Sequence, residues 1–425
     1  MSYGKTVLSN GLTVLTMPVA GVRSVCVSIF VAVGSRYEAD AQAGTSHFLE
    51  HILFKGCRRW PSARAISEAV EGIGGLLNAG TGREATMYWI KVAQPHTRLA
   101  IEVLADMLLH PLLDPAEIRK EQQVVIEEIH MLRDAPESLV QITLNELFWK
   151  DHPLGREISG REETVKSLTR QSLLDYIGQY YGPARTVVSV AGAIEPTEVL
   201  NIVGECFGEW PAAAGGRPAP YTADQHAPRA VVTFKDTEQA HLCLALPGLA
   251  RNHPDQFALT MANTILGDGM SSRLFQEIRE RQALAYSVDS SSSSLHDTGM
   301  LSVYAGVDPE RALHTLSAVL IELQRLRDEL VTPDELRRAL EFNKGRLLLQ
   351  MENTSSVASW YGSQEIYPGR VYSVDEAVAE LERVTREDIL RVAQATLLPD
   401  KVSLSAVGPF RDQEPFLARL QQPWA

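Results

Sequence analysis

Two histidines and a glutamate in the segment GTSHFLEHILFKG (44–56) have a spacing that suits metal chemistry. His47 and His51 are four residues apart, and Glu50 directly precedes His51. In a helix, residues i and i+4 lie one above the other, so both imidazoles can reach one ion while Glu50 stands on the same side. Zinc in a hydrolase takes three protein ligands and a water, and a non-ligating carboxylate can hold the proton of that water. The motif predicts His47 and His51 as ligands and Glu50 as general base. The alternative is a surface helix with incidental histidines.

The third ligand is expected in the long helix PAEIRKEQQVVIEEIHMLRD (115–134). Glu121 and Glu128 lie seven residues apart on a flank that they share with Val124 and Met131, outside both the main apolar stripe and the polar face. An unpaired charge on such a half-buried flank would be unfavourable, and a bound cation would explain both carboxylates. We take Glu128 as the third ligand. Glu127 is the main competitor, and solvated helix charges are the alternative without a metal.

Two similar halves are expected to position these residues. The segment beginning LTRQSLLDYI at residue 168 aligns with VTREDILRVA at residue 384, an offset of 216 residues that holds without gaps to Gly192 and Gly408. In each copy a helix capped by a threonine, Thr169 or Thr385, leads into an apolar strand. Strands that follow one another closely and clustered helices predict an α+β fold. We expect two homologous domains, each a largely antiparallel β-sheet packed with α-helices.

A stretch rich in alanine, proline and glycine separates the halves. Residues 210–230 show no periodicity and are typical of an exposed linker. We therefore expect an N-terminal zinc-binding catalytic domain at residues 1–212, a linker at 213–228 and a homologous C-terminal domain at 229–425. The second half has no His-x-x-Glu-His motif, so it would complete the substrate pocket without holding a metal.

Composition limits the partners of the chain. A net charge of −13 over 425 residues argues against nucleic acid and anionic membrane surfaces. The sequence contains no apolar run long enough to span a bilayer. The four cysteines are widely spaced, which favours structural thiols in a reducing compartment over disulfides, and we expect a cytoplasmic protein.

Motifs along nearly the whole chain resemble the inverzincin peptidases of the insulinase and pitrilysin type, especially the short branch that includes the mitochondrial processing peptidase. The similar segments occur in the family's order: NGLTVL, HFLEHILFKG, GLLNAGTGREATMYWIKV, EQQVVIEEI, HPLGREISG, LGDGMSSRLFQEIRERQALAYSV and the helix around 352–354. The resemblance implies one Zn²⁺ per chain on His47, His51 and Glu128. It also implies that Glu121 supports the site.

The resemblance further implies residues that hold the substrate. Family members add a peptide as a β-strand beside an edge strand after an Asn-Ala pair, which falls on Asn78 and Ala79, and they complete the site with an arginine and a tyrosine, which fall on Arg279 and Tyr286. Without the resemblance, Asn78 and Ala79 could belong to a turn before the strand 86–92. Two departures lie nearby: Gly80 replaces a common aromatic residue, and Gln282-Ala283 replaces a frequent Arg-Gly pair.

These features predict a zinc-dependent endopeptidase for unstructured peptides or presequence-like segments. The expected partners are peptide substrates and either a second copy of the chain or a homologous subunit. The alternatives are a subunit of a heteromeric processing peptidase, a non-catalytic structural or interaction member of the family, and a different zinc hydrolase such as a deacetylase.

Overall fold

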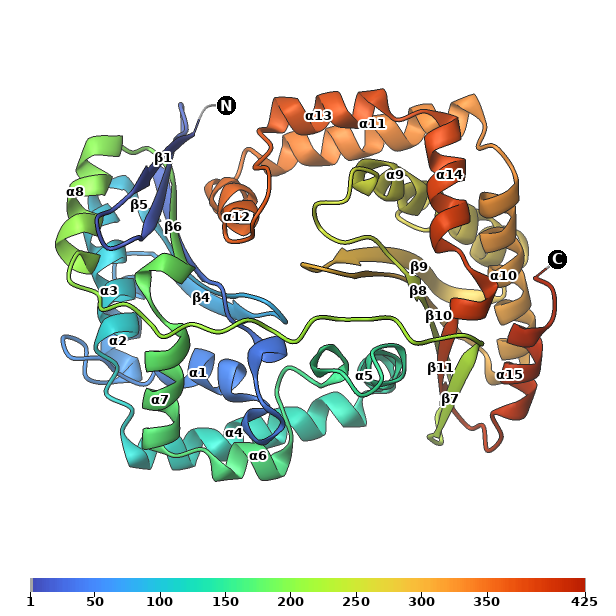
Figure 1. Ribbon diagram of the computed structural model, residues 1–425, viewed down its shortest axis with the longest axis horizontal. Helices are drawn as coiled ribbons and strands as arrows, with labels where there is room; N and C mark the ends of the chain where they lie inside the picture. Colours follow the sequence, from blue (N-terminus) through green and yellow to red (C-terminus); the bar gives the residue numbers. More distant parts are fainter. Residues whose placement is uncertain (1–2, 425) are drawn as a thin grey trace. The chain divides into compact units, whose positions relative to one another are not determined.

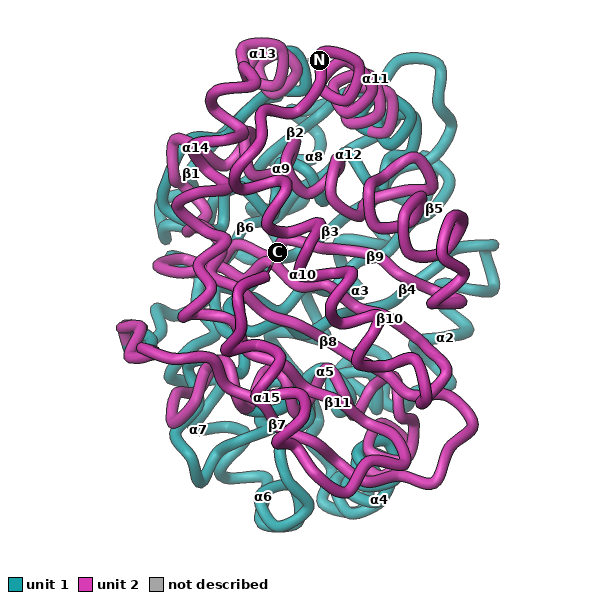
Figure 2. Tube along the Cα trace, turned by 90° about the vertical axis from the view of Figure 1, so that its right-hand side faces the viewer, with its two compact units in different colours: residues 1–129, 156–219, 347–375 teal, residues 130–155, 220–346, 376–425 magenta. Residues whose placement is uncertain are grey.

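The computed structural model describes residues 3–424. The chain forms two compact units, each assembled from three segments (Figure 2). Unit 1 comprises residues 1–129, 156–219 and 347–375, and unit 2 comprises residues 130–155, 220–346 and 376–425.

Unit 1 is built on a six-stranded sheet with strand order β1-β2-β6-β3-β5-β4. Strands β1, β4, β5 and β6 of this sheet are labelled in Figure 1. All neighbouring strands are antiparallel except β2 and β6, which are parallel. The strands are β1 (Gly4–Val7), β2 (Thr13–Pro18), β3 (Ser24–Val31), β4 (Leu76–Thr81), β5 (Thr86–Ala93) and β6 (Thr186–Gly192). The helices of this unit are α1 (Thr45–Leu53), α2 (Ala63–Glu71), α3 (Thr97–Leu109), most of α4 (Pro115–Asp134), α6 (Glu162–Ser167), α7 (Arg170–Tyr180), α8 (Pro196–Phe207) and α12 (Thr354–Glu365).

Both faces of this sheet are covered. Residues such as Val27 and Ile29 of β3 point into the main core, where α3 packs on β3 and β5. The alternate residues of β3 point the other way, toward α12. There a Cβ on Gly362 would lie 2.2 Å from the ring of Phe30, so α12 approaches the sheet closely because it has glycine at this position.

Unit 2 repeats this design with a five-stranded sheet in the order β7-β11-β8-β10-β9. Its strands are β7 (Arg229–Phe234), β8 (Ala240–Pro247), β9 (Ala285–Ser294), β10 (Gly299–Val307) and β11 (Ser403–Gly408). Its helices are α5 (Pro136–Phe148), α9 (Gln256–Leu266), the π-helical segment Phe275–Arg281, α10 (Ala312–Asp328), most of α11 (Pro333–Gln350), α13 (Val374–Arg383), α14 (Arg386–Thr396) and α15 (Glu414–Gln421). Val140 and Leu144 of α5 pack on Cys243 and Val407, on the face of this sheet opposite α9 and α10.

The predicted α+β fold of two homologous domains is confirmed. Numbered along the chain, β2 to β6 and β7 to β11 have the same spatial order, and in each set the first and last strands are the parallel pair. The threonines expected to cap helices do so: the side chain of Thr169 accepts a hydrogen bond from the Ser172 N–H, and that of Thr385 accepts one from the Asp388 N–H.

The compact units do not coincide with contiguous halves of the chain. Helix α5 belongs to the first half in sequence but packs in unit 2, and α12 belongs to the second half but packs in unit 1. The physical reason is that each sheet buries one face under a helix from the other half. The division into a catalytic domain at 1–212, a linker at 213–228 and a second domain at 229–425 stays a prediction.

Two features of composition can be compared with the structure. No helix within residues 3–424 is long and apolar enough to cross a membrane. All four cysteines are free thiols, and Cys26, Cys57 and Cys243 are buried.

The close approach of α12 to its sheet is testable by substitution. Gly362→Val should destabilise the protein by about 2 kcal/mol, because the added side chain collides with Phe30 and overpacks a filled interface. Gly178→Ala in α7 is the matched control, since its Cβ would meet nothing within 4 Å. The urea midpoints of both variants would be compared with that of the wild type, and equal midpoints would contradict the tight packing of α12.

Candidate metal centre

Three side chains from two helices of unit 1 converge on one point. His47 and His51 lie one turn apart on α1, with ring centroids 4.6 Å apart. The carboxylate of Glu128, from α4, lies between them: Oε1 is 3.6 Å from His47 Nε2, and Oε2 is 3.5 Å from His51 Nε2. One ligand atom from each residue lies within 4.8 Å of the others.

These separations fit a tetrahedral ion. Ligand atoms about 2.0–2.1 Å from zinc, at tetrahedral angles, lie about 3.3 Å from one another, which is close to the distances of Glu128 from the two histidines. The donor set of two imidazole nitrogens and one carboxylate oxygen is the set found in zinc hydrolases with an open position. Glu127, the competing third ligand, is exposed and lies outside this group within the described chain. The geometry thus favours Glu128.

Glu121 orients His51 by binding Nδ1, the ring nitrogen that does not face Glu128. Its Oε1 lies 2.9 Å from His51 Nδ1, and its Oε2 lies 2.7 Å from Lys55 Nζ. A hydrogen bond donated by His51 Nδ1 fixes the tautomer in which Nε2 carries the free lone pair, as a metal ligand requires. Burial opposes ionisation of Glu121, but the hydrogen bonds from His51 and Lys55 outweigh it and lower the pKa of this carboxyl.

The two histidines have different electrostatic environments. Burial, with the nearby His51, lowers the pKa of His47 to about 4, so the ring is neutral at physiological pH and available as a ligand. Burial also acts to lower the pKa of His51, but its hydrogen bond to Glu121 and the charges of Glu121, Glu128 and Glu50 raise that pKa overall. Without a metal, the carboxylates therefore favour a proton on His51, which a cation would replace.

Glu50 is held by a residue that the sequence did not reveal. The hydroxyl of Thr81, at the end of β4, donates to Glu50 Oε2 at 2.5 Å. This contact leaves Oε1 as the oxygen available for proton transfer. The only signal in the sequence is that Thr81 lies three residues after Asn78, in the segment expected to form the edge strand.

Asn78 and Ala79 lie in the middle of β4, so the reading of this segment as a turn is wrong. The edge-strand expectation is correct, since β4 pairs only with β5 in the described sheet. The Ala79 N–H donates a hydrogen bond to the side-chain oxygen of its neighbour, Asn78 Oδ1, at 2.8 Å. It therefore faces the open edge, and by alternation Leu77 and Thr81 share this orientation.

Arg279 and Tyr286 lie together in unit 2. The guanidinium of Arg279 is 5.4 Å from the ring centroid of Tyr286 and 4.9 Å from that of Phe275. Tyr286 is 74% exposed, so its hydroxyl is accessible. Nearby, Ala283 has φ +50°, a left-handed conformation that glycine adopts more readily than alanine. That both residues complete the metal site stays a prediction.

Known proteins are similar to this chain over most of its length. Residues 13–162 match the family described as insulinase, peptidase family M16, and residues 167–342 match the domain described as the peptidase M16 inactive domain. A protein of Bacillus subtilis named uncharacterized zinc protease YmxG is 38% identical, with 94% of this chain and 97% of the relative covered. A probable mitochondrial-processing peptidase subunit beta of Arabidopsis thaliana is 32% identical, with 96% of this chain and 78% of the relative covered.

Solved structures share the fold. A protease from Helicobacter pylori superposes with a TM-score of 0.90 at 24% identity, covering 96% of this chain and 99% of that one. A peptidase M16 inactive domain from Pseudomonas fluorescens gives a TM-score of 0.89 at 19% identity, covering 98% of this chain and 100% of that one.

The choice of third ligand can be tested by metal analysis. Glu128→Gln should lose zinc on dialysis, whereas Glu127→Gln, an equal change one residue away, should retain it, because only Glu128 faces both histidines. Glu121→Gln should weaken zinc binding roughly 10-fold by releasing His51. Equal zinc content in the Glu128 and Glu127 variants would exclude Glu128 as a ligand.

Proposed function

Because this chain belongs to the insulinase family of peptidases, family M16, we propose that it is a zinc-dependent endopeptidase that hydrolyses extended, unstructured peptide segments. The observation that carries this proposal is the convergence of His47, His51 and Glu128 with the spacing of ligands around one ion. Relatives are named zinc proteases, which supports zinc as the metal.

The residues of the site have separate tasks. His47, His51 and Glu128 would hold one Zn²⁺, while Glu121 keeps His51 in the ligating tautomer. When bound, zinc supplies Lewis-acid chemistry, lowering the pKa of a water molecule toward about 7 and polarising the peptide carbonyl.

Glu50 moves the proton. Its free oxygen, Oε1, accepts a proton from the water as the water oxygen bonds to the carbonyl carbon. The same oxygen then delivers the proton to the amide nitrogen as the C–N bond breaks. The hydroxyl of Thr81 holds Oε2 and so keeps the carboxylate aimed during both transfers.

The open edge of β4 supports an extended peptide as substrate. The outward N–H groups of Leu77 and Thr81, and that of Ala79 once it releases Asn78 Oδ1, could pair with a peptide strand. Such pairing supplies main-chain affinity without requiring a particular sequence. The edge of the equivalent strand β9 is partly occupied, because the Ser290 N–H donates to Gly267 O at 3.3 Å and Arg251 donates to Ser294 O at 3.1 Å. This contrast favours β4 as the binding edge.

A subunit role is the second candidate. The Arabidopsis relative is named as the beta subunit of a processing peptidase, and the family includes a domain described as inactive. Unit 1 contains three residues with the geometry of metal ligands. Their presence favours a catalytic role for this chain, either in a homodimer or beside a homologous subunit. Measuring the mass and the cleavage activity of the purified chain alone would distinguish these states.

The proposed reaction is tested with Glu50→Gln. This variant should retain zinc but lose cleavage of a library of unstructured peptides, because the carboxamide cannot accept the proton while the three ligands are unchanged. The wild type treated with a chelator is the control for metal dependence. Retained turnover, or loss of zinc from the variant, would contradict the role of Glu50.

The contribution of the second half is tested with Tyr286→Phe. We expect normal zinc content and roughly a 100-fold lower kcat, as is typical when one donor to a developing oxyanion is lost. Ser293→Ala, on the exposed part of the same strand, is the control. An unchanged kcat in Tyr286→Phe would remove Tyr286 from the proposed mechanism.

A further inference from the structure

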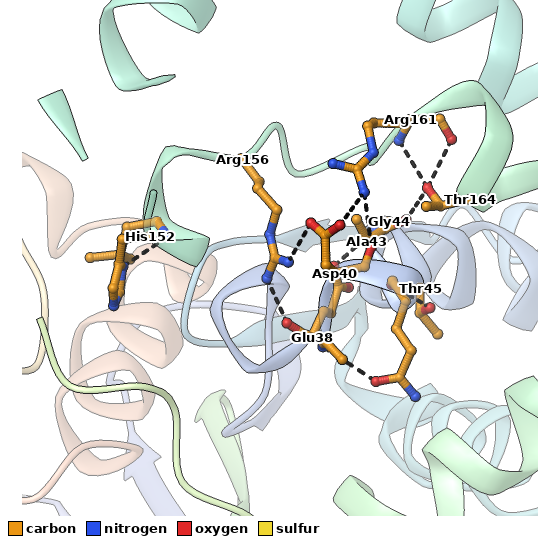
Figure 3. Close-up of polar contacts among 12 residues, drawn as sticks. Glu38, Asp40, Ala43, Gly44, Thr45, His152, Arg156, Arg161 and Thr164 are labelled. Atoms are coloured by element: carbon orange, nitrogen blue, oxygen red, sulfur yellow. Dashed lines mark hydrogen bonds and ion pairs between the residues drawn. The ribbon is translucent and has the colours of Figure 1, made fainter. Parts of the chain in front are cut away.

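The segment HPLGREISG (152–160) has no part in the chemistry proposed above. From Arg156 onward, however, it lies beside the turn of residues 38–44 that leads into α1 (Figure 3). We call this turn the entry turn and α1 the metal helix. Their contacts show what fixes the start of the helix that carries both histidines and the general base.

Glu38 caps the metal helix from six residues before its N-cap. The N-cap residue, Gly44, has no side chain to cap the helix. In its place Glu38 Oε2 accepts the Gly44 N–H at 2.8 Å, and Oε1 accepts the Ser46 N–H at 2.6 Å. A carboxylate in this position satisfies two free donors and interacts favourably with the helix dipole. Burial raises the pKa of Glu38 to about 7, although both N–H donors oppose this shift.

Two arginines hold the entry turn in its shape. Arg156 Nη2 donates to the backbone oxygen of Glu38 at 2.5 Å, and its Nη1 lies 3.4 Å from Asp40 Oδ1. Arg161 Nη2 donates to the backbone oxygen of Asp40 at 3.1 Å and to its Oδ2 at 2.9 Å. The planar guanidinium of Arg156 thus binds the backbone of the residue that caps the helix (Figure 3).

The two segments also meet at a pair of glycines. Thr164 Oγ1 donates to the Ala43 backbone oxygen at 2.7 Å. A Cβ on Gly44 would lie 2.5 Å from the Ser159 backbone oxygen, and one on Gly160 would lie 2.7 Å from Gly44 Cα. Both glycines have positive φ, +92° and +81°. Backbone contact this close leaves the start of the metal helix little freedom to shift.

A short helix needs such support. The metal helix has nine residues, too few to be stable by itself. Ser46, immediately before His47, is anchored twice: its N–H bonds to Glu38 and its hydroxyl lies 2.8 Å from the buried Tyr176 hydroxyl. A displacement of the entry turn would therefore move His47.

We propose that Glu38 and Arg156 are positioning residues, which set the rate of peptide hydrolysis through the placement of His47 and without touching substrate. This inference rests on the proposed peptidase function. A guanidinium remote from the ligands thereby controls the geometry of the site.

The test compares Arg156→Ala and Arg156→Lys with the wild type. Losing a charge-assisted hydrogen bond should speed amide hydrogen exchange of residues 44–48 in the metal-free protein about 10-fold. The visible absorption of cobalt(II) bound in place of zinc should shift, since it reports coordination geometry. The kcat should fall about 10-fold with KM within about twofold of the wild type, and the lysine variant should recover part of each effect.

Arg64→Ala is the matched control, because Arg64 forms an exposed ion pair with Glu68 in the same unit. It should leave exchange, spectrum and kcat unchanged. Unaltered exchange at residues 44–48 in Arg156→Ala, or a uniform rise throughout unit 1 with an unshifted cobalt spectrum, would overturn the proposal. If Arg156→Ala does not fold, Glu38→Gln is judged by the same two readouts. Both readouts are independent of cleavage, so an inactive wild type would refute the proposed function, whereas unaltered exchange with an unshifted cobalt spectrum would refute the positioning role itself.

Discussion

The contact between His51 Nδ1 and Glu121 connects the two helices on which the metal centre depends. Helix α1 supplies two imidazoles and helix α4 supplies a carboxylate, so the site exists only if the two helices keep their register. Glu121 and Glu128 are two turns apart on α4, and His51 lies against both. Glu121 therefore fixes the tautomer of His51, while Glu128 offers a ligand atom to the metal. Lys55 balances the charge of Glu121 and makes its burial tolerable.

The sequence predicts the parts of the candidate site whose residues share one helix. The spacing of His47 and His51 and the flank shared by Glu121 and Glu128 are properties of single helices, so helical periodicity alone predicts both. Thr81 and Glu38 escaped notice because their contacts join separate elements: β4 with α1, and the entry turn with the first turn of α1. Such contacts depend on the tertiary structure, which brings separate elements together. The periodicity of one element carries no information about them. The alignment at an offset of 216 correctly indicated two similar sheets.

The duplication extends to individual hydrogen bonds. Ser189 of β6 and Ser405 of β11 are equivalent at that offset, and both bond to the helix that arrives from the other half. Ser189 Oγ donates to Ala358 O of α12 at 2.7 Å, and Ser405 Oγ lies 2.6 Å from Thr143 Oγ1 of α5. Each sheet thus binds a helix from the other half of the chain through an equivalent serine, while only the first half has the histidine pair. Duplication supplied the framework, and the chemistry is confined to one copy.

The exchange of α5 and α12 makes the halves mutually dependent. Severing the backbone in the linker at 213–228 would not yield two autonomous fragments, because each would lack the helix that shields one face of its sheet. Each fragment would instead carry a projecting helix and an uncovered apolar surface that fits the other's, as in split proteins that reassemble from their pieces. Assembly of the complementary fragments, and not folding of either alone, would then be the event that buries both sheets. In an evolutionary sense, the ancestor of a single half would have needed a second copy of itself to be stable.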